Sequence, residues 1–184
     1  ARTKGCYTAT AFDDNGKVLL NTKLRHGDAL HVSDLDPSNP GLEVWGIHEN
    51  EGDTKRFQTP GVALYSARTG EILWGKGPGE DAGRGMTADI DPRHPGAEMW
   101  ASIEGEDGKH LWTAKGAVIG DKKPRSCNFA IWWDGDLLRE LLDRNVISKW
   151  DWEAGVDKAI FTADGATSNN GSKSNPALSA DLFG

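Results

Sequence analysis

Stretches in which apolar and polar side chains alternate run through most of this chain, and turn residues separate them. Alternation with a period of two is typical of a strand with one buried face. Glycine-containing turns between such stretches predict hairpins. Three pairs of stretches fit this description: residues 7–12 with 17–24, 62–65 with 71–74, and 110–112 with 118–119. The pattern therefore predicts a chain of antiparallel β-hairpins.

A twelve-residue stretch occurs twice. Residues 34–45 return as residues 89–100, fifty-five positions later, with seven of the twelve residues unchanged. The copies read Asp-Leu-Asp-Pro-Ser-Asn-Pro-Gly-Leu-Glu-Val-Trp and Asp-Ile-Asp-Pro-Arg-His-Pro-Gly-Ala-Glu-Met-Trp. Each copy follows an extended segment and leads into an alternating one, so it is interpreted as the connection of a further hairpin.

An acidic hairpin followed by a glycine-turn hairpin gives four strands per repeat. Repeated four-stranded units of this length indicate the blades of a β-propeller, whereas a generic sandwich need not repeat its turn chemistry. We expect an all-β fold of four-stranded antiparallel propeller blades, in one partial domain over residues 1–184. The repeats are expected near residues 25–76, 80–122 and 125–163, with the start of a further blade at 176–184.

The third repeat is less regular than the other two. Residues 127–133 begin its first hairpin, and its acidic pattern is reduced to Asp134, Asp136 and a distant Glu140. The spacing of the four leucines in residues 137–143 fits an amphipathic helix, and a strand or a short helical turn fits equally well. About three blades cannot close a ring and leave strand edges open. We therefore expect the chain to be part of a longer propeller, or to be completed by other polypeptide.

The repeated turns carry oxygen ligands beside a glycine, which is the chemistry of a hard-cation site. Calcium takes six to eight oxygens. The alternative is an Asp-rich turn that only caps its own backbone. Two copies that keep both aspartates and the downstream glutamate favour calcium, with these candidate ligands: Asp34, Asp36, Ser38 and Glu43 in the first turn, and Asp89, Asp91 and Glu98 in the second.

The charge and composition of the chain limit the classes of molecule that it can bind. The formal charge of −7 argues against nucleic acid, and it would repel an acidic polysaccharide unless bound cations intervened. No stretch approaches the length of a membrane span, and the first residues are not a signal peptide. Two cysteines, Cys6 and Cys127, allow one disulfide but decide little. These features fit a mature extracellular protein, and a cytosolic location is the alternative.

Aromatic and histidine residues carry weaker signals. The eight tryptophans, at strand positions, are expected to be mostly core, with one or two at most stacking on sugar rings. His48, His94 and His110 are expected at the surface or in turns.

Four stretches carry a family resemblance: 25–36 (Arg-His-Gly-Asp-Ala-Leu-His-Val-Ser-Asp-Leu-Asp), 89–91 (Asp-Ile-Asp), 131–143 (Ile-Trp-Trp-Asp-Gly-Asp-Leu-Leu-Arg-Glu-Leu-Leu-Asp) and 170–176 (Asn-Gly-Ser-Lys-Ser-Asn-Pro). In combination they resemble rhamnogalacturonan lyases of polysaccharide lyase family eleven. The resemblance implies an eight-bladed propeller with structural calcium, of which this chain holds about three blades. It also implies a central cleft and eliminative cleavage of the pectin backbone, in a secreted, extracellular protein whose partners are that acidic polysaccharide and the remaining blades.

The resemblance also implies site residues. Asn170, Gly171 and Ser172 match a segment that contacts sugar, with Ser172 in place of the family's threonine, and Lys173 matches a catalytic-site lysine. By resemblance His31 is a metal ligand near the cleft; the alternative is a hydrogen-bonded interior histidine.

Elimination requires removal of the C5 proton of a uronate whose carboxylate has been neutralised. Lys173 can bind that carboxylate as a cation or take the proton as a neutral base. Two other functions compete: a non-catalytic, calcium-stabilised propeller for glycan binding or adhesion, and a structural fragment. The segment from Asn170 to Lys173 separates the lyase from a propeller that needs only its acidic turns.

Overall fold

The computed structural model of this chain describes residues 9–49 and 58–166. These residues form three four-stranded antiparallel sheets and a separate hairpin, which confirms the all-β prediction. The helical content of the described part is the short 3-10 helix η2 (Asp107–Lys109). No helix there is long and apolar enough to cross a bilayer.

Each sheet is made of four strands that follow one another in the sequence. The first sheet spans residues 29–78, the second 82–120 and the third 129–162. The strands are β3 (Ala29–Ser33), β4 (Glu43–Ile47), β5 (Pro60–Ser66) and β6 (Ile72–Pro78) in the first sheet; β7 (Ala82–Ala88), β8 (Glu98–Ile103), β9 (Leu111–Trp112) and β10 (Val118–Gly120) in the second; and β11 (Phe129–Ile131), β12 (Glu140–Asp143), β13 (Val146–Asp151) and β14 (Val156–Thr162) in the third.

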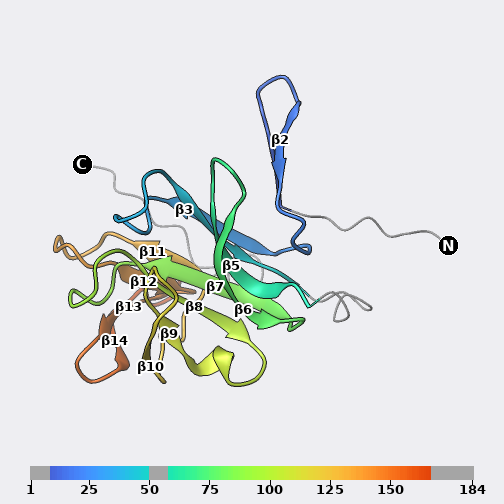
Figure 1. Ribbon diagram of the computed structural model, residues 1–184. Coiled ribbons are helices and arrows are strands. Elements are labelled where there is room, and N and C mark those ends of the chain that lie inside the picture. The colour runs from blue at the N-terminus through green and yellow to red at the C-terminus, as the bar shows by residue number, and fades with distance from the viewer. Residues whose placement is uncertain (1–8, 50–57, 167–184) are drawn as a thin grey trace.

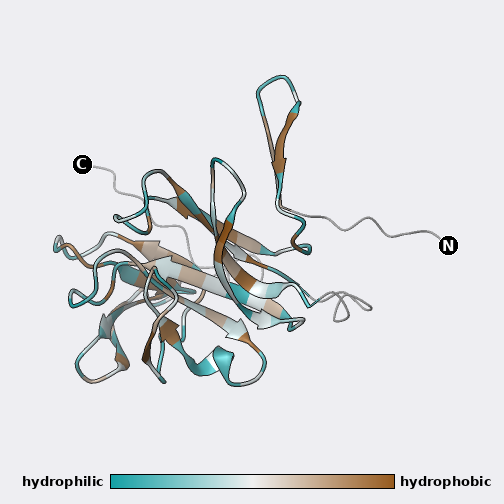
Figure 2. Cartoon of the chain, viewed as in Figure 1, coloured by the Kyte–Doolittle hydropathy of each residue, from teal (hydrophilic) through white to brown (hydrophobic). Residues whose placement is uncertain are grey.

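The ambiguous stretch at 137–143 resolves as a strand. It forms β12 from Glu140 onward, and β12 pairs with β11 and β13. The hairpin of β1 (Thr10–Phe12) and β2 (Val18–Asn21) projects away from the three sheets (Figure 1). Its strands are shorter than predicted. Hydrophobic residues run along β2 (Figure 2), and Leu19 is 62% exposed there.

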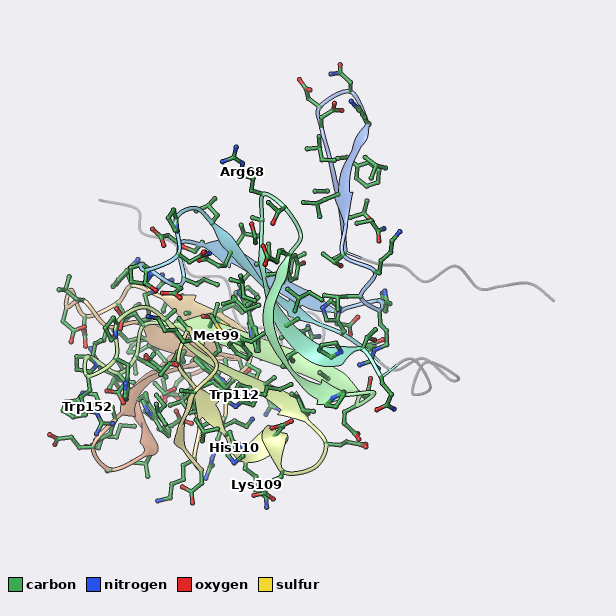
Figure 3. All side chains as sticks on the ribbon, in the orientation of Figure 1. Arg68, Met99, Lys109, His110, Trp112 and Trp152 are labelled. Carbon is green, nitrogen blue, oxygen red and sulfur yellow. The ribbon has the colours of Figure 1, made fainter. Side chains whose placement is uncertain are left out.

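The second sheet is buried on both faces because successive residues of β8 point to opposite sides. Met99 and Ala101 pack with Trp45 of the first sheet, whereas Trp100 packs with Leu141 of the third. Figure 3 shows Met99 and Trp112 toward the interior, with Lys109 and His110 at the edge. The prediction that most tryptophans are core is confirmed: Trp45, Trp100, Trp112 and Trp150 are buried, Trp74 and Trp152 are partly buried, and Trp132 and Trp133 are exposed.

The first two sheets approach closely through a glycine. A Cβ atom on Gly85 of β7 would lie 2.2 Å from the Ile47 side chain of β4. The first strands of successive sheets also adjoin, since β3 contacts β7 and β7 contacts β11. The His31 ring joins the same strands, with Nε2 3.0 Å from the Gly85 carbonyl oxygen.

Candidate cation sites

Three acidic turns, one per sheet, connect the first strand to the second. They lie next to one another, because the backbone N–H of Ala97 donates to the Leu35 carbonyl and that of Arg139 donates to the Asp89 carbonyl. The two repeated turns predicted from the sequence and the irregular third one therefore share one rim of the described structure.

All three turns are organised by a buried glutamate at the start of the second strand. One carboxylate oxygen of each glutamate accepts two successive backbone N–H groups of its turn. Glu43 Oε2 accepts from residues 35 and 36 at 2.9 and 3.1 Å, and Glu98 Oε2 accepts from residues 90 and 91 at 2.9 Å each. Glu140 Oε2 accepts from residues 133 and 134 at 2.8 and 3.4 Å. The glutamate thus fixes the shape of the turn.

An aspartate caps each turn in the same way. Asp36 Oδ1 accepts the backbone N–H of Ser38 at 3.0 Å and its hydroxyl at 2.7 Å. Asp91 Oδ1 accepts the backbone N–H of Arg93, and both Asp91 oxygens also accept from the Arg93 guanidinium. The backbone capping that was the alternative to calcium is therefore present. It does not use every oxygen, and Asp34 and Asp89 are exposed beside these turns.

The turns differ at the second oxygen of the buried glutamate. Glu43 Oε1 accepts the Asn39 amide at 2.6 Å. In the second turn His94 stands where Asn39 does, and Glu98 Oε1 is buried without a hydrogen-bond partner among the described residues. In the third turn Glu140 Oε1 likewise makes no hydrogen bond of regular geometry, but it lies 2.8 Å from the ammonium of Lys149, which compensates its charge. Of the three, the second turn therefore has an uncompensated carboxylate oxygen.

The electrostatics of the second turn follow from that oxygen. Burial raises the pKa of Glu98 to about 8, against the two backbone hydrogen bonds, and the charges of Asp89 and Asp91 raise it further. Burial would also raise the pKa of Asp91, but hydrogen bonds from Arg93 hold it below its usual range. A buried, unpartnered carboxylate oxygen can accept a cation. In the second turn, however, both Asp91 oxygens already accept from Arg93, and Asp89, Asp91 and Glu98 do not converge as a ligand group in the described structure.

We expect the Glu98 carboxylate to lower the stability of the calcium-free protein as pH rises and to raise stability when calcium binds. Without calcium, its raised pKa means that the folded state binds a proton the unfolded state has lost, so stability falls as pH rises from about 4.5 to 8. Glu98→Gln should remove this slope and stabilise the calcium-free protein by roughly 1–3 kcal/mol at pH 8. With calcium bound the same variant should be the less stable one. Denaturant unfolding with chelator and with calcium measures both.

The exposed Glu104 offers a matched control, since Glu104→Gln removes a charge just past the end of the same strand. It should alter stability little under either condition. Equal effects of Glu98→Gln with chelator and with calcium would contradict a cation site in the second turn.

A second group of candidate metal ligands lies at the end of the first sheet opposite its acidic turn, in the residues just before β3 and just after β4. His26 Nε2 is 3.6 Å from Asp28 Oδ1 and 3.7 Å from Glu49 Oε2. A hydrogen bond with Asp28 raises the pKa of Glu49, and partial burial and the charges of Asp28 and Asp81 add to this. Two carboxylates that face each other beside an imidazole can hold a divalent cation.

Sequence reasoning missed this group because its members are far apart in the chain. The signal was the register of the first hairpin: Ala29 pairs with Ile47, so the residues before β3 lie opposite those after β4. The Glu49 backbone N–H accordingly donates to the His26 carbonyl at 2.7 Å.

His48, expected at the surface or in a turn, is instead 3% exposed. The expectation was wrong because His48 extends a buried strand and its ring Nδ1 lies 2.9 Å from the Arg25 carbonyl oxygen. Burial lowers the pKa of His48 to about 4, against that hydrogen bond. Arg25, His26 and His48 line a hollow of about 170 Å³ at this end of the sheet.

Comparison with known proteins decides the family. Residues 2–184 match the family described as rhamnogalacturonan lyase family 11, C-terminal domain. The chain belongs to this family. It is 52% identical to the rhamnogalacturonan endolyase YesW and to the rhamnogalacturonan exolyase YesX, both of Bacillus subtilis (strain 168). Each alignment covers 97% of this chain but only 27% of the endolyase and 30% of the exolyase, so the chain spans under a third of their length.

Solved structures of family 11 lyases share the fold. The crystal structure of YesW superposes with a TM-score of 0.83 at 52% identity, covering 95% of this chain and 28% of that one. The structure of the Bacillus licheniformis rhamnogalacturonan lyase PL11 gives 0.84 at 50% identity, covering 96% and 28%.

The structure describes two of the three sets of expected site residues. The acidic-turn residues Asp34, Asp36, Ser38 and Glu43, and Asp89, Asp91 and Glu98, lie on the common rim described above. His31 lies on β3 with one ring nitrogen taken by the Gly85 carbonyl, as in an interior hydrogen-bonded histidine. Asn170, Gly171, Ser172 and Lys173 lie outside the described residues.

Proposed function

We propose that this chain is the C-terminal part of a rhamnogalacturonan lyase that cleaves the rhamnose–galacturonate backbone of pectin by β-elimination. The observation that carries the proposal is the family match over residues 2–184, together with 52% identity to an endolyase and an exolyase of the same polysaccharide. No described feature favours the non-catalytic alternative.

The proposed architecture is a partial β-propeller domain over residues 1–184, of which the three sheets are blades. The adjoining first strands β3, β7 and β11 are then the inner strands that line the axis. Large apolar residues remain exposed on the first and third sheets, which supports a role for further blades in covering them: Leu30, Val32, Ile160 and Phe161.

The substrate face is proposed at the ends where the chain enters the inner strands. His26 and Asp28 precede β3, and Asp81 precedes β7. Residues 170–173 precede residues 176–184, which the repeat pattern predicts as the start of the next blade.

The reaction breaks the C5–H bond of galacturonate and its C4–O bond to rhamnose, and it forms a C4–C5 double bond. The rhamnose oxygen leaves with the electrons of the C4–O bond and takes up a proton from solvent, so that it departs as a hydroxyl. A bound calcium ion would supply positive charge that makes the C5 proton more acidic. Lys173 either binds the uronate carboxylate or accepts the C5 proton, and Asn170, Gly171 and Ser172 hold the sugar. We place the enzyme outside the cell, where a plant cell-wall polysaccharide is accessible.

Calcium is proposed as the resident cation of the acidic turns. The support is the buried, unpartnered oxygen of Glu98 and the oxygen-only donor sets of the first two turns. Such ions would offset part of the chain's charge of −7 before it meets an acidic polymer.

The activity is tested by incubating the complete protein with rhamnogalacturonan and following the ultraviolet absorbance of the unsaturated uronate. We expect a steady increase, with YesW as a positive control. The size distribution of the products then distinguishes internal from terminal cleavage. No increase under conditions in which YesW is active would refute the proposed activity.

A further inference from the structure

The third acidic turn contains an internal cation. The ammonium of Lys149 lies 2.5 Å from Asp134 Oδ2, 2.6 Å from Asp136 Oδ2 and 2.8 Å from Glu140 Oε1. These three carboxylates also satisfy the geometry of a metal-ligand group, with one oxygen from each within 4.8 Å of the others. A lysine ammonium has three N–H donors, so it can face one oxygen of each.

The third turn is equivalent to the other two despite its different sequence. Its glutamate organises two successive backbone N–H groups as Glu43 and Glu98 do, but the separation from the second of them is six residues instead of seven. Asp134 caps the backbone N–H of Asp136 as Asp36 caps that of Ser38. Asp134 is therefore the counterpart of Asp36 and Asp91, and Asp136 takes the place of Ser38.

The position of Lys149 is set by strand pairing. Glu140 of β12 pairs with Lys149 of β13. In the first sheet the corresponding glutamate, Glu43, pairs with Ser66 of β5. A long cationic side chain in the third sheet thus replaces a short hydroxyl in the first, and it reaches back over the turn.

The local charges agree with this arrangement. Glu140 is 1% exposed, so its carboxylate needs a compensating charge. Burial alone would lower the pKa of Lys149, but its hydrogen bonds to the acidic groups raise it. The hydrogen bond from Lys149 lowers the pKa of Asp134. The Lys149 ammonium and the Asp134 carboxylate hold one another in their charged forms.

We propose that the ammonium of Lys149 occupies the cation position of the third turn and thereby excludes a divalent ion from it. The turn is closed without metal, although its carboxylates are arranged as ligands. The calcium proposed for the other two turns is the point of comparison for this inference, which does not depend on lyase activity.

The test is a change of the lysine to the residue of the first sheet, Lys149→Ser, in the complete protein. Crystals of the native protein and of the variant are soaked with terbium chloride, and anomalous difference density is examined at each turn. We expect no terbium in the native third turn and one ion among Asp134, Asp136 and Glu140 in the variant. Terbium in the native third turn, or an empty third turn in the variant crystals, would overturn the inference.

Lys158→Ser is the matched control, because it removes a lysine of the same sheet whose partner is Asp151, outside the turn. It should leave the third turn empty. If Lys149→Ser does not fold, Asp136→Asn in the otherwise native protein should leave the number of bound calcium ions in equilibrium dialysis unchanged. Loss of one ion would contradict the inference.

The outcomes separate this inference from the proposed calcium role. Empty first and second turns beside an occupied third turn in Lys149→Ser would remove calcium from those turns and keep the role of Lys149. Terbium in the first and second turns together with an empty third turn in the variant would support calcium in the first two turns and would remove the proposed role of Lys149.

Discussion

Lys173→Ala in the complete protein should lower kcat/KM on rhamnogalacturonan by about 100-fold or more. A side chain that transfers the C5 proton or neutralises the uronate carboxylate contributes at least that factor. The ultraviolet assay of the unsaturated product measures it, and circular dichroism checks the fold. The exposed Lys115 provides the matched control, since Lys115→Ala should retain the native rate. A native rate in Lys173→Ala would remove Lys173 from the mechanism.

Lys173→Arg separates the two proposed roles. Arginine keeps the positive charge but cannot act as a base at working pH. Retention of a substantial rate would indicate that Lys173 binds the carboxylate. Loss of rate with intact substrate binding would indicate that it takes the proton, because a base must first be neutral and arginine stays charged.

Lys149→Ala should destabilise the protein by about 3 kcal/mol in the absence of calcium. Removing one partner of a buried charge group leaves the others uncompensated, and Glu140 is almost fully buried. Denaturant unfolding with chelator present measures the loss. Calcium should restore part of it, since an ion that binds only the folded state stabilises by about 2.7 kcal/mol at a concentration 100 times its Kd.

Lys158→Ala supplies the comparison for this variant. The Lys158 side chain is 63% exposed and its ion pair with Asp151 lies at the surface, so we expect a loss below about 1 kcal/mol that calcium does not change. Similar losses in Lys149→Ala and Lys158→Ala would mean that the third turn tolerates its uncompensated carboxylates.

The repeat predicted the sheets well because it carries the residues that shape the turns. Glu43 and Glu98 each fix two backbone N–H groups of their own turn. Because this interaction is local in the sequence, it can be recognised without knowing the rest of the fold. The third turn was recognised from Asp134, Asp136 and Glu140 but was interpreted as degenerate, because its compensating charge comes from another strand.

What depended on pairing between distant residues could not be predicted. Glu49 meets His26 only through the register of β3 and β4, and Lys149 meets Glu140 only through that of β12 and β13. Local polarity suggested an exposed His48, whereas its burial follows from packing at the end of the same sheet. Each case depends on contacts across strands, which local composition does not encode.

The order of strands in the sheets has a consequence for how the chain folds. Every strand of a sheet pairs with its neighbours in the sequence, from β3 through β6, β7 through β10 and β11 through β14. The loops to be closed are therefore short, and topologies rich in local contacts fold quickly. A chain leaving the ribosome can complete the first sheet before the second has been synthesised, which limits mispairing between strands of different repeats.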